Sequence, residues 1–170
     1  IESVLSRSIE GANAEVIAAQ VAGVGGEQAR WKPDPTQWSI LEVTSHLADE
    51  EVDDFRTRLD LTLHRPEAEW PRIDPQRWAV ERRYNEGSLD EALARFIDRR
   101  AETLTWLAGL ATPDWTSAHQ HPRFGPISAG DLMISWVAHD YIHVRQLNRL
   151  HRGYLVASLP EHSPAYAGKW

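Results

Sequence analysis

The sequence predicts an all-α protein, a four-helix bundle with a long crossover between its second and third helices. Three observations lead to this fold class. Apolar residues recur at helical spacing in four segments of the chain. A serine with a carboxylate three residues later, the pattern of a capping box, opens three of these segments. The region between the second and third segments, residues 64–87, contains three prolines and has no clear period, which favours a crossover over a tight turn.

Composition indicates one globular domain, residues 1–170, with an irregular C-terminal strap over about 153–170. Hydrophobic residues make up 42% of the 170 residues, and cysteine is absent, which excludes disulfides and thiolate ligands. The net charge is -7, and acidic and basic residues are interspersed along the chain without a basic block, so a nucleic-acid partner is not expected. No apolar run approaches the roughly 20 residues that span a bilayer, so no membrane partner is expected. These features predict a cytoplasmic protein.

The first predicted helix covers about residues 2–21 and ends at the glycine-rich stretch 23–26. One face of it carries Leu5, Ile9, Ala12 and Val16. The second helix opens at Ser39, which forms a capping-box pattern with Glu42, and continues to about Leu63.

The second helix has two faces that compete for the core. One carries Leu41, Ala48, Val52, Phe55 and Leu59, and the nearly opposite face carries Val43, His46 and Glu50. If His46 points into the bundle, the Leu41 face needs another cover, and a second subunit is the natural candidate. If the Leu41 face is the core face, His46 lies at the surface.

The third helix opens at Ser88, again with a carboxylate, Glu91, three residues later. Its apolar stripe reads Leu89, Leu93, Phe96, Leu104 and Leu107. Arg100 interrupts this stripe. Such an arginine usually extends its head group to solvent, but its fork of donors also makes Arg100 a possible cofactor-binding residue for an anionic group.

A loop over about 112–126 contains His119 and His121, which are expected at the surface or at a pocket rim. The fourth helix starts at Ser128, with Asp131 in the capping position, and ends near residues 151–153. One face of this helix carries Leu132, Trp136, His139, His143, Leu147 and Leu150.

His139 and His143 lie four residues apart, so both imidazoles leave the same face of the fourth helix. The rest of that face is apolar and should be buried. Buried neutral imidazoles need partners for both ring nitrogens, and a shared metal ion is the simplest arrangement that satisfies the pair. The alternative is that both are ordinary core or surface histidines, and the pair alone leaves both readings open.

His46 is the best candidate for a third ligand, because a mononuclear catalytic centre typically takes three protein ligands and leaves one position open. Glu50, one helical turn further along the chain, is a possible additional ligand or general base. Three neutral imidazoles suit Zn, Ni, Mn, Fe or Cu, so the ligand type does not identify the metal.

Two segments resemble the signature segments of the DinB/YfiT-like family of metalloenzymes. They read Trp38-Ser-Ile-Leu-Glu-Val-Thr-Ser-His46-Leu-Ala-Asp-Glu50 and His139-Asp-Tyr-Ile-His143-Val-Arg-Gln-Leu147. The resemblance covers about residues 3–150. It implies a four-helix bundle of up-down-down-up order that is often dimeric, and a divalent metal held by His46, His139 and His143. Relatives include thiol-dependent transferases and a mycothiol-dependent maleylpyruvate isomerase.

The expected function is therefore a metal-dependent enzyme that acts on a small molecule. The first hypothesis is a thiol-dependent S-transferase or isomerase that uses bacillithiol, mycothiol or glutathione, since the chain has no cysteine of its own. The second is a hydrolase that uses metal-bound water, with Glu50 as a possible base. The third is a non-catalytic metal-binding or stress-response dimer. A homodimer is expected in each case.

Overall fold

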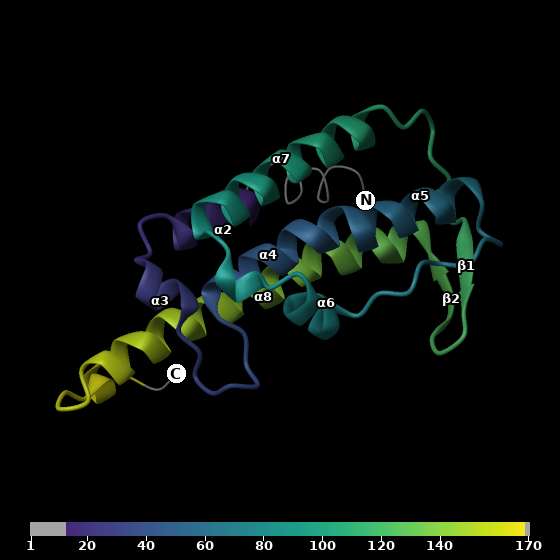
Figure 1. Ribbon diagram of the computed structural model, residues 1–170. Coiled ribbons are helices and arrows are strands. Elements are labelled where there is room, and N and C mark those ends of the chain that lie inside the picture. The colour runs from purple at the N-terminus through teal and green to yellow at the C-terminus, as the bar shows by residue number, and fades with distance from the viewer. Residues whose placement is uncertain (1–12, 169–170) are drawn as a thin grey trace.

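The computed structural model describes residues 13–168, which are mostly helical (Figure 1). The long helices are α4 with its continuation, α7 and α8, and they lie side by side. In chain order the elements are α2 (Asn13–Val21), α3 (Gly26–Arg30), α4 (Ile40–Glu50), the π-helix η2 (Glu51–Arg56), α5 (Thr57–His64), α6 (Pro75–Glu81), the 3-10 helix η3 (Tyr84–Glu86), α7 (Leu89–Ala108), β1 (Ala118–His121), β2 (Gly125–Ser128), α8 (Ala129–Ser158) and the 3-10 helix η4 (Pro164–Ala167). The up-down-down-up order stays a prediction.

Helix α4 is the central element, because every one of its residues is buried. It packs against α7 and α8, and also against α3, α6 and η3. The predicted capping box is confirmed: the Glu42 N–H donates to Ser39 Oγ at 3.1 Å, and the Ser39 N–H donates to Glu42 Oε2 at 2.9 Å. A polar and an apolar face of α4 are therefore both enclosed by the same chain.

Both faces of the second helix are buried within the chain, so neither His46 nor the Leu41 face is left at the surface. Leu41 packs against Ala29 and Ala92 in one core cluster. Phe55 stacks on Trp136 of α8, with ring centroids 5.3 Å apart. Both contacts come from within the chain, so a second subunit is not needed to cover this face. A homodimer stays a prediction that a solution mass measurement would test.

The second helix is interrupted by the π segment η2, directly after Glu50. The Thr57 hydroxyl donates to the Val52 carbonyl at 2.7 Å, which helps to satisfy the widened turn. The sequence predicts a regular helix here and gives no indication of the π segment. Such segments occur often at functional sites, and this one follows the turn that carries His46.

The predicted first helix is described only over α2, and its face residues Leu5, Ile9 and Ala12 lie outside the described residues. Within α2, Val16 is 45% exposed, so the prediction that it faces the core is wrong. The buried side chains are instead one position further along the helix and one turn to each side: Asn13, Ile17 and Val21.

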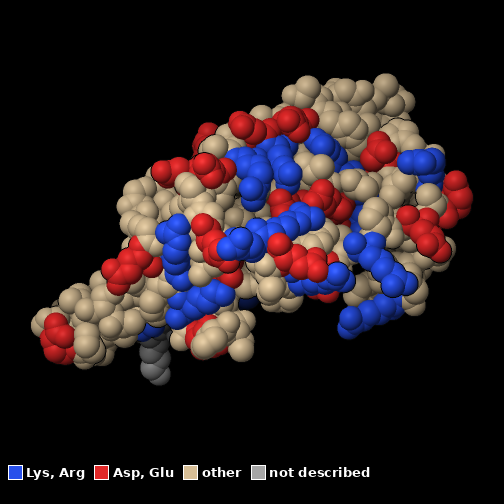
Figure 2. All heavy atoms as spheres, in the orientation of Figure 1, with Lys and Arg blue, Asp and Glu red and all other residues tan. Residues whose placement is uncertain are grey.

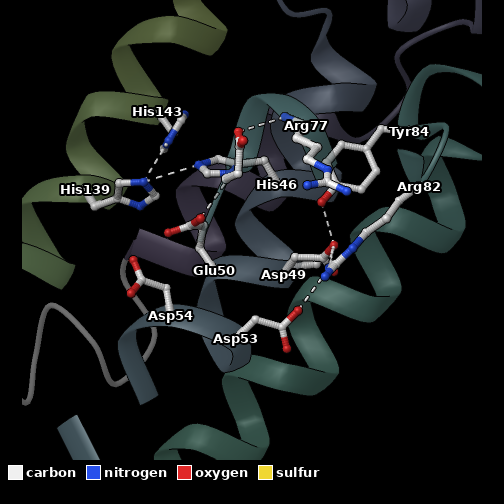
Figure 3. A network of polar contacts seen from close by, with 12 residues as sticks. His46, Asp49, Glu50, Asp53, Asp54, Arg77, Arg82, Tyr84, His139 and His143 are labelled. Carbon is white, nitrogen blue, oxygen red and sulfur yellow. Dashed lines mark hydrogen bonds and ion pairs between the residues drawn. The ribbon is translucent and has the colours of Figure 1, made fainter. Parts of the chain in front are cut away.

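The crossover contains a short helix, α6, where the sequence predicts irregular chain. Asp74 caps this helix by accepting the Arg77 N–H at 3.0 Å, and Pro75 occupies its first turn. Beyond α6, Arg82 Nη1 and the Tyr84 hydroxyl both donate to the buried carboxylate of Asp49, the latter at 2.6 Å (Figure 3). These bonds fasten the crossover onto α4.

In place of the expected loop over 112–126, the strands β1 and β2 form a two-stranded antiparallel hairpin that ends at Ser128, so the all-α prediction is wrong over the two strands. In this hairpin His119 of β1 lies opposite Ile127 of β2. His119 is buried rather than at the surface: it stacks on Trp70, with centroids 4.3 Å apart, and its Nδ1 lies 2.9 Å from the Pro66 carbonyl. The hairpin thereby holds the start of the crossover.

Helix α8 begins as predicted, with a capping box between Ser128 and Asp131, but it continues through Gly153 to Ser158. The irregular C-terminal strap is therefore shorter than predicted. Gly153 lies inside this helix, and the Trp31 indole packs directly on it. A Cβ at this position would lie 3.0 Å from Trp31 Cη2. Gly153 therefore does not end the helix but leaves room for the side chain of Trp31.

Gly153→Ala is expected to destabilise the protein by about 1–2 kcal/mol, because the displaced indole costs more than the alanine gains in helix propensity. Chemical denaturation would measure this change. Gly26→Ala is the matched control, since its Cβ would meet only the end of the flexible Arg30 side chain. Equal stabilities for the two variants would contradict the packing argument.

Charged side chains of both signs are interspersed on the face shown in Figure 2, as the sequence predicts. Within the part of the chain that the structure describes, no helix has the length and apolar character required to cross a bilayer.

Candidate metal centre

Two helices bring together the three histidines predicted from the sequence. His46 lies on α4, and His139 and His143 lie one turn apart on α8, which packs against α4. His46 and His143 are buried, and His139 is partly exposed. Figure 3 shows the three rings turned toward one another.

The three Nε2 atoms converge on one point. The Nε2 atoms of His143 and His139 are 3.1 Å apart, and those of His46 and His139 are 3.3 Å apart. Nitrogen ligands about 2.0–2.1 Å from a tetrahedral zinc ion are separated by about 3.3–3.4 Å. The spacing is therefore that of a ligand set for a transition metal. Among the described residues, these three histidines are the group of three or more His, Asp or Glu side chains that could hold a metal ion. Their ligand atoms all lie within 4.8 Å of one another.

Burial keeps the imidazoles neutral. It lowers the pKa of His46 to about 2, with further lowering from the neighbouring His143 and His139. Burial also lowers the pKa of His139 to about 3, and it lowers the pKa of His143. A neutral imidazole has one ring nitrogen with a free lone pair, and this neutral form is the one that binds metals.

Gln146 fixes which nitrogen of His143 is free. His143 Nδ1 lies 2.8 Å from Gln146 Oε1, an acceptor, so Nδ1 carries the hydrogen and donates it. The lone pair is then on Nε2, the atom that faces the other two rings. Gln146 was missed in the sequence, although its position three residues after His143 places it on the same helix face.

Glu50 lies behind His46 rather than at the convergence point. Its Oε1 is 3.7 Å from His46 Nδ1, the ring nitrogen that does not face His139. Neither atom has a hydrogen-bond partner in the structure, although both are buried. Burial and a hydrogen bond with Asp54 raise the pKa of Glu50 to about 9. This position suits a carboxyl group that orients His46 better than it suits a ligand.

Aromatic rings enclose the histidines from two sides. Trp38, the residue before the cap of α4, packs on His46 with ring centroids 4.6 Å apart. Phe55 of the π segment lies 5.1 Å from the His139 ring. Apolar walls of this kind limit water and strengthen the interactions of a bound ion.

Arg100, the possible cofactor-binding residue, is engaged by two carboxylates in the core. Its guanidinium donates to Glu51 at 2.7 and 3.0 Å and to Asp140 at 3.0 and 3.0 Å. The side chain is 3% exposed. These bonds occupy the fork of donors that an anionic cofactor would need.

The remaining histidines do not join the three-histidine group. His119 and His121 line a separate cavity between the hairpin and the crossover, together with Trp70 and Phe124. His151 links α8 to the N-terminal part of the chain: its Nε2 lies 2.8 Å from the Gln20 carbonyl.

The donor set therefore fits a divalent transition metal. Three neutral nitrogen ligands lie within 4.8 Å of one another, and Gln146 directs the lone pair of His143 toward the other two rings.

A sequence model described as the DinB superfamily matches residues 11–147, which include all three histidines. The chain belongs to the DinB superfamily. Among solved structures, YfiT from Bacillus subtilis is similar to this DinB chain over 89% of its length and 86% of the YfiT chain, with a TM-score of 0.77 and 17% sequence identity. YfiT is described as a probable metal-dependent hydrolase with an unusual four-helix bundle topology. At this identity the likeness shows the fold. No curated protein sequence matches the chain.

Acid is expected to destabilise the metal-free DinB chain through its histidines. The pKa of His46 and His139 is about 2 and about 3 in the folded state, against 6.5 ordinarily. Below about pH 6.5 the unfolded chain therefore binds more protons, and stability falls as the pH falls toward the folded values. The expected loss is about 2 kcal/mol per histidine by about pH 5.

Denaturant titrations of the wild type and of His46→Gln/His139→Gln, each made metal-free, would test this expectation. Glu50 acts in the opposite direction, because its raised pKa makes stability decline as the pH rises from 4.5 toward about 9. The measurement is therefore the difference between the two slopes. Parallel slopes would contradict the assignment of buried neutral imidazoles.

Proposed function

We propose that this DinB-superfamily chain is a divalent-metal-dependent enzyme that uses an external low-molecular-weight thiol as the nucleophile in an S-transfer or isomerisation of a small electrophile. The observation that carries the proposal is a three-histidine group to which no carboxylate of the described chain belongs. Such a set leaves coordination positions for exogenous groups.

A divalent ion held by His46, His139 and His143 would lower the pKa of a coordinated water or thiol and so supply a nucleophile at neutral pH. The chain's own residues prepare this site. Gln146 holds the His143 hydrogen on Nδ1, and Glu50 faces the outer nitrogen of His46. Trp38 and Phe55 shield the rings.

The position of Glu50 supports a thiol over water. Activation of water for hydrolysis is commonly assisted by a general base, which must lie within hydrogen-bond reach of the proton it takes. Glu50 faces the outer nitrogen of His46, and its pKa of about 9 keeps it protonated at neutral pH in the metal-free protein. A thiol is far more acidic than water and is deprotonated by metal coordination outright. Since the chain has no cysteine, the thiol must come from outside.

Metal-dependent hydrolysis is the second candidate. The description of YfiT as a probable metal-dependent hydrolase supports it, since that protein shares the fold of this chain. In this version water takes the place of the thiol, and the same three histidines hold the metal.

The test begins with the metal content of the protein purified without added metal, beside His139→Asn/His143→Asn. Protein loaded with Zn, Ni, Mn or Fe would then be assayed with electrophiles in the presence of glutathione, bacillithiol or mycothiol, and with esters, amides and phosphoesters alone. Turnover that needs both thiol and metal, and is lost in the double variant, supports S-transfer. Turnover without thiol supports hydrolysis. A metal-loaded protein inert in both panels would overturn an enzymatic function and leave a metal-binding protein.

A further inference from the structure

A cavity of about 470 Å³ lies beside the three histidines, between the loop that precedes α4 and the outer face of α8. Its polar lining consists of arginines and glutamines, without any carboxylate: Gln37, Arg145, Gln146, Arg149 and Arg152. Apolar walls come from both sides, including Trp38 and Ile142. The lining thus combines three positive charges with an apolar surface.

Two residues connect this cavity to the histidines. Gln146 lines it and also accepts the hydrogen bond from His143 Nδ1 at 2.8 Å. Trp38 lines it and packs on His46, with ring centroids 4.6 Å apart. A molecule in the cavity is therefore separated from two of the three histidines by a single side chain.

Arg145 and Arg149 are the basis for assigning a ligand. They lie four residues apart on α8, so their side chains leave the same face and can act on one molecule. Neither makes a hydrogen bond or ion pair within residues 13–168. Arg152, by contrast, is engaged in a further interaction. Several other arginines of the described chain are paired with carboxylates, as Arg82 is with Asp49 and Asp53.

We propose that this cavity binds the oxyanion group, a carboxylate or phosphate, of the small molecule that reacts at the three histidines. This inference rests on the proposed function and narrows it to an anionic substrate or an anionic thiol. The planar forks of Arg145 and Arg149 match the geometry of carboxylate and phosphate oxygens. The cavity volume fits a small molecule, and the interspersed surface charge argues against a polymeric nucleic acid.

The test measures binding of inorganic phosphate and of succinate to metal-free protein by calorimetry. Saturable binding is expected for the wild type, and at least tenfold weaker binding for Arg145→Gln/Arg149→Gln. Both arginines are exposed, so this variant should fold. The matched control is Arg72→Gln/Arg123→Gln, which removes two exposed arginines from the cavity at the hairpin and should bind as the wild type does. Equal binding by the two double variants, or no saturable binding by the wild type, would overturn the proposal.

The link to the histidines needs a second readout. In protein loaded with Mn, bound phosphate should show a broadened phosphorus signal, and Arg145→Gln/Arg149→Gln should lose the broadening at the same phosphate concentration while keeping its metal. Broadening that persists in this variant would mean that phosphate binds at the metal without the cavity, which contradicts the proposal.

Failure of the proposed function is distinguishable from failure of this inference. Metal binding without anion binding would reject the cavity assignment and leave the metal site intact. Anion binding by a protein that takes up no metal would reject the metal-dependent function, and with it the link between cavity and histidines.

Discussion

His143→Ala is expected to weaken zinc binding by about 100-fold or more. Structural zinc sites with four ligands bind with about 10–16 kcal/mol, so each ligand contributes on the order of 3 kcal/mol. Each 1.4 kcal/mol corresponds to about a tenfold change in affinity. His143 is also the histidine whose tautomer is set by a neighbour, Gln146, so the lone pair of its Nε2 is directed toward the other two rings. Competition with a chromophoric chelator at neutral pH would measure the change.

Two further variants make this prediction specific. Gln146→Leu leaves all three imidazoles in place but removes the partner of His143 Nδ1, and a loss of about 10–100-fold is expected. His121→Ala removes a histidine from the hairpin, outside the three-histidine group, and should leave affinity unchanged. If all three variants bound zinc as the wild type does, the histidines would be core residues and the metal centre would be rejected.

The sequence predicts the α8 half of this site from local pattern alone. His139 and His143 share a face because the helical period fixes their relation, and the apolar residues along that face indicate burial. His46 could not be placed in the same way. Assigning a core face from periodicity assumes that one face of the helix is exposed to solvent. Every residue of α4 is buried, so both of its competing apolar stripes lie in the core. The resemblance to the DinB family, rather than the spacing, selects His46.

Other features depend on contacts between distant parts of the chain. Arg100 reads as an interruption of a stripe, and nothing local indicates that Glu51 and Asp140 approach it from 49 and 40 residues away. The hairpin strands are four residues each, too short for a period to be recognised, and their histidines read as loop residues. The short helix α6 did have a local signal, Asp74 followed by Pro75, which the sequence analysis overlooked.

Arg100→Met is expected to destabilise the protein by about 3–5 kcal/mol, because it leaves two carboxylates buried without a cation. The side chains of Arg100, Glu51 and Asp140 are 3%, 1% and 2% exposed. Glu51 also accepts a hydrogen bond from Trp136 Nε1 at 3.1 Å, so the network cannot simply turn toward solvent. Chemical denaturation would measure the loss. Arg77→Met, which breaks the exposed pair with Glu81, should cost less than about 1 kcal/mol.

The reason for charges in this core can be tested by removing all three together. The triad joins the π segment, α7 and α8, and Asp140 directly follows His139, so it fixes how α8 is rotated against α4. Buried ion pairs contribute less to stability than apolar residues of similar volume. The variant Glu51→Leu/Arg100→Met/Asp140→Leu should therefore recover most of the stability lost in Arg100→Met. If the triad sets the position of the histidines, this variant should still bind zinc more weakly than the wild type. Recovery of both stability and zinc affinity would show that the metal centre does not depend on the triad.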